Sequence, residues 1–207
     1  RHKTNSYTYL IQKEKDFFSN RLAEKLKNNI PLYVDYRRGT KTYVEPMNIE
    51  DDPLIEKMTK QKYVKQMIAL SKQKKGKVLE LCCGAGWLSL ELAREGLDVT
   101  GIDLNPYLIR IANQFKYDNP FTSTFGRLTY KIVDLNKIEL PKNRYNTVVI
   151  WEGLHHIMNY KLLIAEIKTT LKKNGQLIIF ENIGLSYTGK LIQCLLYFFL
   201  PQTVIPF

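Results

Sequence analysis

Residues 77–87 of the chain read KVLELCCGAGW, and this stretch decides the fold. An apolar run is followed by Gly84 and Gly86, which let the backbone turn sharply and approach a ligand closely. A helical apolar pattern begins at Trp87, and a second apolar run, VTGI at residues 99–102, ends in Asp103. A strand, a glycine turn, a helix and a strand with a terminal carboxylate are typical of a site for an adenosine-type cofactor at the end of a parallel sheet.

The composition is that of one globular α/β domain with an N-terminal appendage. Of the 207 residues, 44% are hydrophobic and 25% are charged. We expect a helical N-terminal cap at residues 1–71 and a cofactor-binding core at residues 77–207. The formal net charge is +11. Lysine-rich surface helices explain this charge more simply than a polyanion such as RNA, so nucleic acid is the less favoured partner.

Cysteine usage indicates a reducing compartment. The chain has three cysteines, two of them adjacent, which is no framework for disulfides. The start has no signal-peptide pattern and is Arg1 rather than methionine, so we expect a trimmed start and a cytoplasmic protein. The apolar run at residues 191–200 is about half the length that spans a bilayer. We therefore expect no transmembrane segment, and we expect this run to pack on the core or in a dimer contact.

Hydrophobic patterns predict the order of helices and strands. Phe18, Leu22 and Leu26 share one helical face, which predicts a helix over residues 1–30, and the letters DDP at residues 51–53 predict the start of a helix that runs to residue 71. Strands are expected at 78–81, 99–102, 128–133, 147–151 and 176–180, and helices at 87–94, from 105 onward and at 160–172. This alternation predicts a doubly wound, mostly parallel sheet, with the ligand crevice at the carboxyl ends of the strands.

These motifs, in this order, resemble those of the class I S-adenosylmethionine (SAM)-dependent methyltransferases over residues 77–185. VLELCCGAG at residues 78–86 is similar to the family's first motif, with Cys82 in place of its first glycine. Asp103 stands where the family's ribose-binding carboxylate ends the second strand. VDL at residues 133–135 resembles the pair that reads the adenine edge, and VVIWEGLHHI at residues 148–157 resembles the fourth motif, which borders the transferred methyl group.

The resemblance implies a Rossmann-like fold, SAM as the cofactor and S-adenosyl-L-homocysteine (SAH) as its product. Glu80 suits the α-amino group of SAM, and Asp103 has the two oxygens that two ribose hydroxyls require. The family usually ends in an antiparallel pair of strands for which this sequence has no pattern, which predicts a fragment or a shortened variant. The implied cofactor-binding residues are Glu80, Cys82, Gly84, Gly86, Asp103, Leu104, Asp134, Leu135 and Trp151.

Other interpretations of the glycine turn stay open. The turn half-satisfies the fingerprint of a nicotinamide dinucleotide site, with Ser89 at the third position, although Glu80 would repel the pyrophosphate. Alternatively, the glycines serve only a tight turn. A zinc site that joins the adjacent cysteines to His155 and His156 is disfavoured, because adjacent ligands lack the usual spacing, and we expect no metal.

A base is needed where the methyl acceptor is a hydroxyl or an ammonium group, since a proton must then be removed. The turn after the fourth strand offers Glu152, His155 and His156. Histidine suits this role near neutral pH, and similar small-molecule methyltransferases have a histidine at the position of His156. We therefore rank His156 first and His155 second as catalytic residues, against the alternative that they cap the next helix or pack under the cofactor.

The segment ahead of residue 77 is the expected lid, because this part of the family commonly folds over the cofactor. Tyrosine offers an apolar face with a hydroxyl, and arginine binds carboxylates through two hydrogen bonds. Candidates of these types are Tyr7, Tyr9, Tyr33, Tyr36, Arg37 and Arg38.

The expected function is SAM-dependent methylation of a small-molecule or sugar-type acceptor at oxygen or nitrogen. RNA methylation is the alternative that the net charge suggests, but the fourth strand lacks the Asn/Asp-Pro-Pro-Tyr/Phe tetrapeptide, and there is no separate basic domain with interleaved aromatic residues. A second alternative is a non-catalytic SAM-binding subunit that acts through a partner docked on residues 191–200. Methyl turnover by the purified chain separates this alternative from an enzyme.

Overall fold

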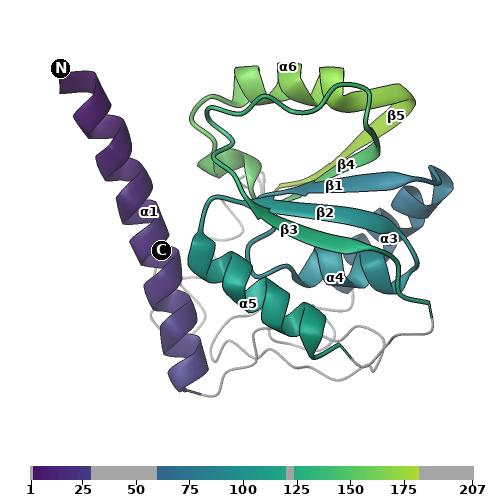
Figure 1. Cartoon of the computed structure of the whole chain (residues 1–207), viewed down its shortest axis with the longest axis horizontal. Helices are drawn as coiled ribbons and strands as arrows, with labels where there is room; N and C mark the ends of the chain where they lie inside the picture. Colours follow the sequence, from purple (N-terminus) through teal and green to yellow (C-terminus); the bar gives the residue numbers. More distant parts are fainter. Residues whose placement is uncertain (1, 29–59, 120–123, 182–207) are drawn as a thin grey trace, which may run out of the picture.

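A computed structural model describes residues 2–28, 60–119 and 124–181 of the chain. Its centre is a parallel sheet of five strands in the order β3-β2-β1-β4-β5, with helices on both faces (Figure 1). This confirms the predicted doubly wound fold. The strands are β1 (Lys77–Leu81), β2 (Asp98–Asp103), β3 (Leu128–Ile132), β4 (Tyr145–Trp151) and β5 (Leu171–Phe180). The helices are α1 (His2–Lys27), α3 (Lys60–Gln73), α4 (Trp87–Arg94), α5 (Pro106–Tyr117) and α6 (Tyr160–Thr170), with a 3-10 turn, η2, at Leu154–His156.

The two faces of the sheet bury different residues of the same strand, because neighbouring side chains point to opposite sides. Val78 and Val99 pack with residues of α3, α4 and α5 on one face. Leu79 and Leu81 pack with α6 on the other. All four side chains are buried, and each contributes about 1.5–3 kcal/mol to stability. A slip of one residue would exchange the two sets, so packing fixes the register of β1 between β2 and β4.

The junction of α6 and β5 differs from the prediction. The helix ends at Thr170, short of the predicted residue 172, and β5 begins at Leu171, ahead of the predicted residue 176. The carbonyl groups of Thr169 and Thr170, which the end of α6 leaves without a partner inside the helix, accept hydrogen bonds from backbone amides of the loop that precedes β4. The chain then pairs with β4 at once, and residues 172–175 form a bulge in that pairing.

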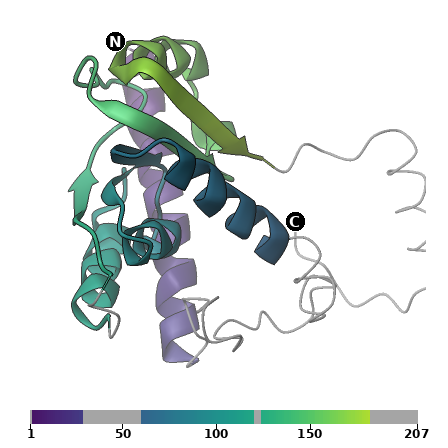
Figure 2. The same ribbon diagram turned by 90° about the vertical axis from the view of Figure 1, so that its right-hand side faces the viewer.

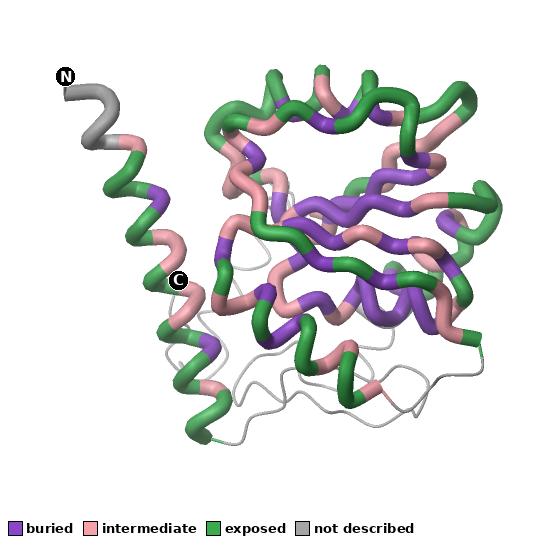
Figure 3. Tube along the Cα trace, in the orientation of Figure 1, coloured by how far each residue is buried: buried purple, intermediate pink, exposed green. Residues whose placement is uncertain are grey.

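The N-terminal helix α1 lies apart from the layers of the sheet, beside the carboxyl ends of the strands (Figures 1 and 2). Exposed and intermediate positions predominate along α1 (Figure 3). Ile11 and Leu22 are buried, whereas Tyr9 and Phe17 are largely exposed. Two buried apolar side chains on a helix of this length make a narrow contact stripe. The helix expected over residues 1–30 is thus present, and it rests on the rest of the chain along one edge.

Within the described ranges, no helix is long and apolar enough to cross a membrane. Several expectations lie outside the described residues and stay predictions. These are the helix start at residues 51–53, the apolar run at residues 191–200 with its dimer contact, and the lid candidates Tyr33, Tyr36, Arg37 and Arg38.

Candidate functional site

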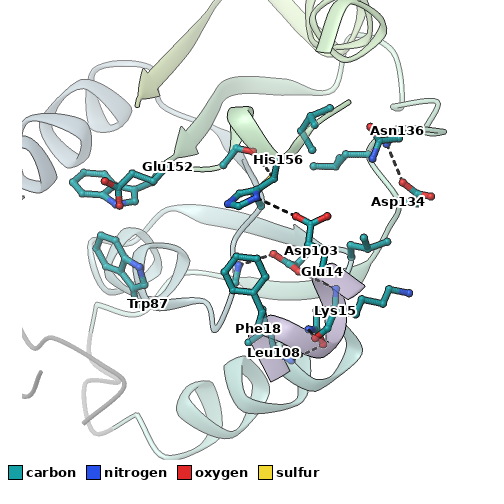
Figure 4. Close-up of a pocket in the computed structure, with 18 residues that line it drawn as sticks. Glu14, Lys15, Phe18, Trp87, Asp103, Leu108, Asp134, Asn136, Glu152 and His156 are labelled. Carbon is teal, nitrogen blue, oxygen red and sulfur yellow. Dashed lines mark hydrogen bonds and ion pairs between the residues drawn. The ribbon is translucent and has the colours of Figure 1, made fainter. Parts of the chain in front are cut away.

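A cavity of about 280 Å³ lies at the carboxyl ends of the strands, next to α1 (Figure 4). Its strand side consists of the loop after β1, the residues that end and follow β2 and β3, and the turn after β4. Its other side consists of α1, which contributes Glu14, Lys15 and Phe18. Doubly wound sheets bind ligands at this edge, which is the position that the sequence predicted.

The loop after β1 turns sharply because three of its residues adopt the left-handed backbone conformation. Cys82, Gly84 and Gly86 have φ values of 56°, 52° and 79°. At Gly86 a Cβ would collide with the hydroxyl of Tyr130 and lie 2.7 Å from the Cβ of Ala112, so glycine is required. At Gly84 a Cβ would meet nothing within 4 Å, and this glycine leaves its backbone open to the cavity.

Asp103 holds this loop from the end of β2. Its Oδ2 accepts a hydrogen bond of 2.9 Å from the amide of Gly84, and its Oδ1 accepts one of 2.8 Å from the amide of Asn105. Burial raises the pKa of Asp103, while hydrogen bonds from backbone amides oppose the rise. Each carboxylate oxygen keeps a further lone pair, so Asp103 can accept hydrogen bonds from two hydroxyl groups of a ligand.

Glu80 lies behind the loop rather than in the cavity wall. Its side chain is buried, and it accepts a hydrogen bond from the hydroxyl of Ser89 in the first turn of α4. Burial raises the pKa of Glu80 to about 8, although the hydrogen bonds from Ser89 act in the opposite direction. Among the predicted site residues, Gly86 and His155 also lie outside the wall as the described part of the chain forms it. The predicted residues that line the cavity are Cys82, Gly84, Asp103, Leu104, Asp134, Leu135, Trp151 and His156.

Asp134 follows β3 and lies under α1. The hydroxyl of Tyr7 donates a hydrogen bond of 2.6 Å to its Oδ2, and the amide of Asn136 donates one of 3.0 Å to its Oδ1. Burial, followed by the hydrogen bond and the charge of Asp134, raises the pKa of Tyr7 to about 12. Tyr7 is therefore a lid candidate that contacts a site residue, whereas Tyr9 is 58% exposed.

Two histidine–carboxylate pairs lie side by side in the turn after β4. Nδ1 of His156 lies 3.1 Å from Oε1 of Glu14 on α1, and Nδ1 of His155 lies 2.8 Å from Oε2 of Glu181. The two ring centroids are 4.0 Å apart. Burial lowers the pKa of His156, and the neighbouring His155 lowers it further, while Glu181 opposes the change. A neutral imidazole that lines the cavity can accept a proton near neutral pH.

Glu181 also orders the backbone of this turn. Its Oε1 accepts hydrogen bonds from the amides of Gly153 and Leu154, at 2.8 and 2.5 Å. Burial would raise the pKa of Glu181, but the hydrogen bonds from His155 and from the two amides outweigh it, and the pKa lies below its usual value. Glu181 therefore serves the turn itself, since one oxygen binds the backbone and the other binds His155.

The wall near the turns after β1 and β4 is aromatic. Trp151 stacks on Phe180 with ring centroids 4.1 Å apart, and Trp87 meets Trp151 edge to face at 5.3 Å. Such ring pairs are worth about 0.5–1.5 kcal/mol beyond the area that they bury. They hold the start of α4 against the end of β4 and give the cavity a rigid apolar surface.

The adjacent cysteines behave as small packing residues. Burial raises the pKa of both thiols well above the usual value, and Sγ of Cys82 lies 3.5 Å from the carbonyl oxygen of Gly153. In the three described ranges, no group of three or more His, Cys, Asp and Glu side chains is arranged to hold a metal ion.

The sequence analysis expected a lid from the N-terminal segment but missed Glu14, Lys15 and Phe18 of α1, and it missed Glu181. Ile11, Glu14, Phe18 and Leu22 follow one helical face, and this spacing was the available signal for the inner side of α1. The spacing does not say what that face covers. Glu181 stands directly after β5, at the sheet edge where Asp103 ends β2, and this position was the available signal for it.

The glycine turn, the carboxylate at the end of β2 and the cavity beside them form the arrangement that is typical of nucleoside-binding sites in doubly wound proteins. Residues 56–205, most of the chain, match the family model described as a methyltransferase domain. The chain belongs to this family, the class I SAM-dependent methyltransferases, whose cofactor is SAM. The resemblance of the sequence motifs to this family is thereby confirmed.

Individual relatives agree with this assignment. The chain is 32% identical over 103 residues to the ubiquinone biosynthesis O-methyltransferase of Haemophilus ducreyi, a match that covers 50% of this chain and 44% of the relative. It is 29% identical over 131 residues to the protein of the same name from Coxiella burnetii, a match that covers 63% of this chain and 52% of the relative. The chain thus spans about half the length of these curated relatives. A solved SAM-dependent methyltransferase from Methanosarcina mazei is 26% identical, with a TM-score of 0.54 and 62% of each chain covered.

Proposed function

We propose that the protein transfers the methyl group of SAM to a hydroxyl oxygen of a small, largely apolar molecule. The observation that carries this proposal is that one cavity is lined both by Asp103, which suits a ribose, and by His156, which suits the removal of a proton. The names of the relatives, which are O-methyltransferases, support oxygen as the acceptor atom. Apolar lining residues such as Phe18, Trp87 and Ile157 favour an apolar acceptor over a sugar.

The wall residues that the sequence predicted each have a role in this proposal. Asp103 binds the ribose, and the turn at Cys82 and Gly84 faces the methionine half of SAM. Leu104, Asp134 and Leu135 surround the adenine, and Trp151 borders the methyl group. Glu80 and Gly86 shape the turn from behind, consistent with their place outside the wall.

The chemical step is an in-line displacement. The acceptor oxygen forms a bond to the methyl carbon while the carbon–sulfur bond breaks, and the bonding pair stays on sulfur, which becomes the neutral thioether of SAH. The hydroxyl proton passes to His156, with His155 as the second candidate. Holding the acceptor opposite the carbon–sulfur bond is worth several kcal/mol, and a positioned base contributes roughly 10²–10⁴-fold.

RNA is a poorer fit to this cavity than a small acceptor. Carboxylates of Glu14, Asp103, Asp134 and Glu152 line it, and Lys15 is the one basic side chain of the lining that the described residues supply besides His156. A cavity lined by these carboxylates repels phosphates, although the net charge of +11 remains compatible with a polyanion bound at another surface of the protein. We also propose a cytoplasmic location, which the free thiols of Cys82 and Cys83 support.

Labelled methyl transfer tests the proposal. The purified chain is incubated with methyl-labelled SAM and, separately, with a panel of phenols and catechols, a panel of sugars, and RNA. We expect label in a phenol or catechol. Binding of SAH without turnover of any acceptor would instead support the non-catalytic subunit, and label in RNA alone would support the nucleic-acid enzyme. Absence of SAH binding by calorimetry would contradict all three.

A further inference from the structure

The two histidines of the turn after β4 have carboxylate partners from different parts of the molecule. Glu181, the partner of His155, follows β5 and is already engaged by two backbone amides. Glu14, the partner of His156, comes from α1, and its carboxylate reaches across the cavity to Nδ1 at 3.1 Å (Figure 4). His155 is 56% exposed at its side chain and lies outside the wall, whereas His156 lines the cavity together with Glu14.

The contact with Glu14 leaves one nitrogen of His156 available for chemistry. A neutral imidazole carries its proton on one nitrogen and a lone pair on the other. A carboxylate beside Nδ1 favours the proton at Nδ1, so the lone pair is at Nε2. Phe18, one helical turn beyond Glu14, packs edge to face on the ring with centroids 5.2 Å apart, which restrains the ring orientation.

Charged groups from several elements surround this pair. On its own turn His156 has His155, and Glu181 reaches the turn from the end of β5. Burial raises the pKa of Glu14, and Asp103 and Asp134 at the strand ends raise it further, while His155 lowers it. Lys15 on α1 and Glu152 after β4 line the same cavity. A bound cation such as the sulfonium of SAM offsets the repulsion among these carboxylates and favours ionised Glu14.

We propose that Glu14 of α1 is a positioning residue for His156: it holds the Nδ1–H tautomer and thereby directs Nε2 toward the acceptor hydroxyl. This inference rests on the proposed function, in which His156 removes the acceptor proton. Because Glu14 belongs to α1, the base is complete only when α1 is seated on the strand ends. Hydrogen bonds between α1 and the core, from Tyr7 to Asp134 and from Asn105 to the Lys15 carbonyl, keep it seated.

Glu14→Ala tests this role, with Glu24→Ala as the matched control. Both changes remove a glutamate from α1 and insert the best helix former, but Glu24 is exposed. For Glu14→Ala we expect kcat to fall about ten- to a hundredfold, a part of the roughly 10²–10⁴-fold that a general base supplies. We expect the dissociation constant for SAH to stay unchanged, and Glu24→Ala to alter neither quantity.

The imidazole tautomer gives a second readout that does not depend on turnover. With ¹⁵N-histidine labelling and saturating SAM in the absence of an acceptor, we expect His156 of the wild-type chain to show Nδ1–H and the Glu14→Ala chain to shift toward Nε2–H. The chain has three histidines, so single substitutions of His2 and His155 assign the signals. If no acceptor is methylated by any variant, the proposed function fails, while the spectrum still decides the pairing.

Two results would overturn the inference. An unchanged tautomer in Glu14→Ala would show that Glu14 does not set the state of His156. Loss of SAH binding in Glu14→Ala, with binding retained in Glu24→Ala, would make Glu14 a ligand-binding residue instead. An unchanged tautomer is decisive even if kcat falls, because a fall in kcat alone has other causes.

Discussion

The strand side and the α1 side of the cavity are built in different ways. On the strand side, the carboxylate of Asp103 accepts hydrogen bonds from the backbone amides of Gly84 and Asn105, at the end of a sheet whose two faces are packed. On the α1 side, the side chains of Tyr7 and Ser19 and the carbonyl of Lys15 make single hydrogen bonds to the core, and the helix buries Ile11 and Leu22 as its apolar anchors in the described part. Burial of two such residues supplies only about 3–6 kcal/mol. The strand side is therefore a fixed floor, and α1 is a cover held by a small free energy.

This contrast assigns different tasks to the two sides. In the proposed function the floor binds the cofactor, and the hydrogen bond that joins Asp103 to Gly84 does not involve α1. The cover brings Glu14 and Phe18 to His156, and so it completes the proposed base. Local opening occurs where few apolar contacts hold an element, which points to α1 as the part that admits ligands.

The largest expected effect concerns the floor. Asp103→Ala removes the proposed acceptor for ribose hydroxyls and the observed acceptor for the Gly84 amide. A hydrogen bond to a charged group is worth about 1.5–3 kcal/mol, so we expect SAH affinity to fall about 100-fold or more by calorimetry. Asp98→Ala, at the opposite end of β2, is the control and should leave affinity unchanged. A folded Asp103→Ala chain that binds SAH like the wild type would contradict the description of the floor.

The two glycines of the turn separate stability from binding. Gly86→Ala places a Cβ against the hydroxyl of Tyr130 and against Ala112, besides its left-handed φ, so we expect the free energy of unfolding to fall by about 2–4 kcal/mol. Gly84→Ala meets no atom within 4 Å, so it should cost about 1–2 kcal/mol from the backbone alone. Its added methyl group stands in the cavity and should weaken SAH binding instead. Denaturant unfolding and calorimetry on both variants check this pattern; equal losses of stability would contradict it.

The floor was more predictable from the sequence than the cover. The glycine turn after β1, the carboxylate at the end of β2 and the helix start at Asn105 each follow a short sequence pattern, and each was placed correctly. The docking of α1 depends on side chains that meet residues far along the chain, such as Glu14 with His156. No period in the sequence encodes that partner. The early start of β5 was not predicted for the same reason: its pairing with β4, which is distant in sequence, overrides the local helical pattern.

The pH dependence of stability tests the buried carboxyl beneath the floor. The pKa of Glu80 is raised from 4.5 to about 8, so the folded chain keeps a proton that the unfolded chain releases. The contribution of Glu80 to the free energy of unfolding is therefore complete below about pH 4.5, and it is lost as the pH rises to about 8. One pKa unit corresponds to about 1.4 kcal/mol. Relaxation of the protein around a buried charge reduces the effect, so we expect the free energy of unfolding to fall by about 2 kcal/mol over this pH range.

Substitution isolates this contribution. Glu80→Gln keeps an acceptor for the Ser89 hydroxyl but has no charge, so the curve of unfolding free energy against pH should flatten between about pH 4.5 and about pH 8. Glu139→Gln, at an exposed position, should leave the curve unchanged. A Glu80→Gln curve parallel to that of the wild type would show that Glu80 is not the source.

The smallest expected effect concerns the seating of the cover. Ser19 of α1 accepts a hydrogen bond of 3.0 Å from the side chain of Asn105, which also caps α5. Ser19→Ala removes a neutral hydrogen bond worth about 0.5–1.5 kcal/mol, so we expect amide hydrogen exchange in α1 to rise up to about tenfold while exchange in β1 stays unchanged. Asn20→Ala, at an exposed neighbouring position, should change neither. Because the floor does not depend on α1, SAH affinity should change less than kcat. If amide exchange in β1 rose as much as in α1, the cover and the floor would open as one unit, which would contradict the contrast between them.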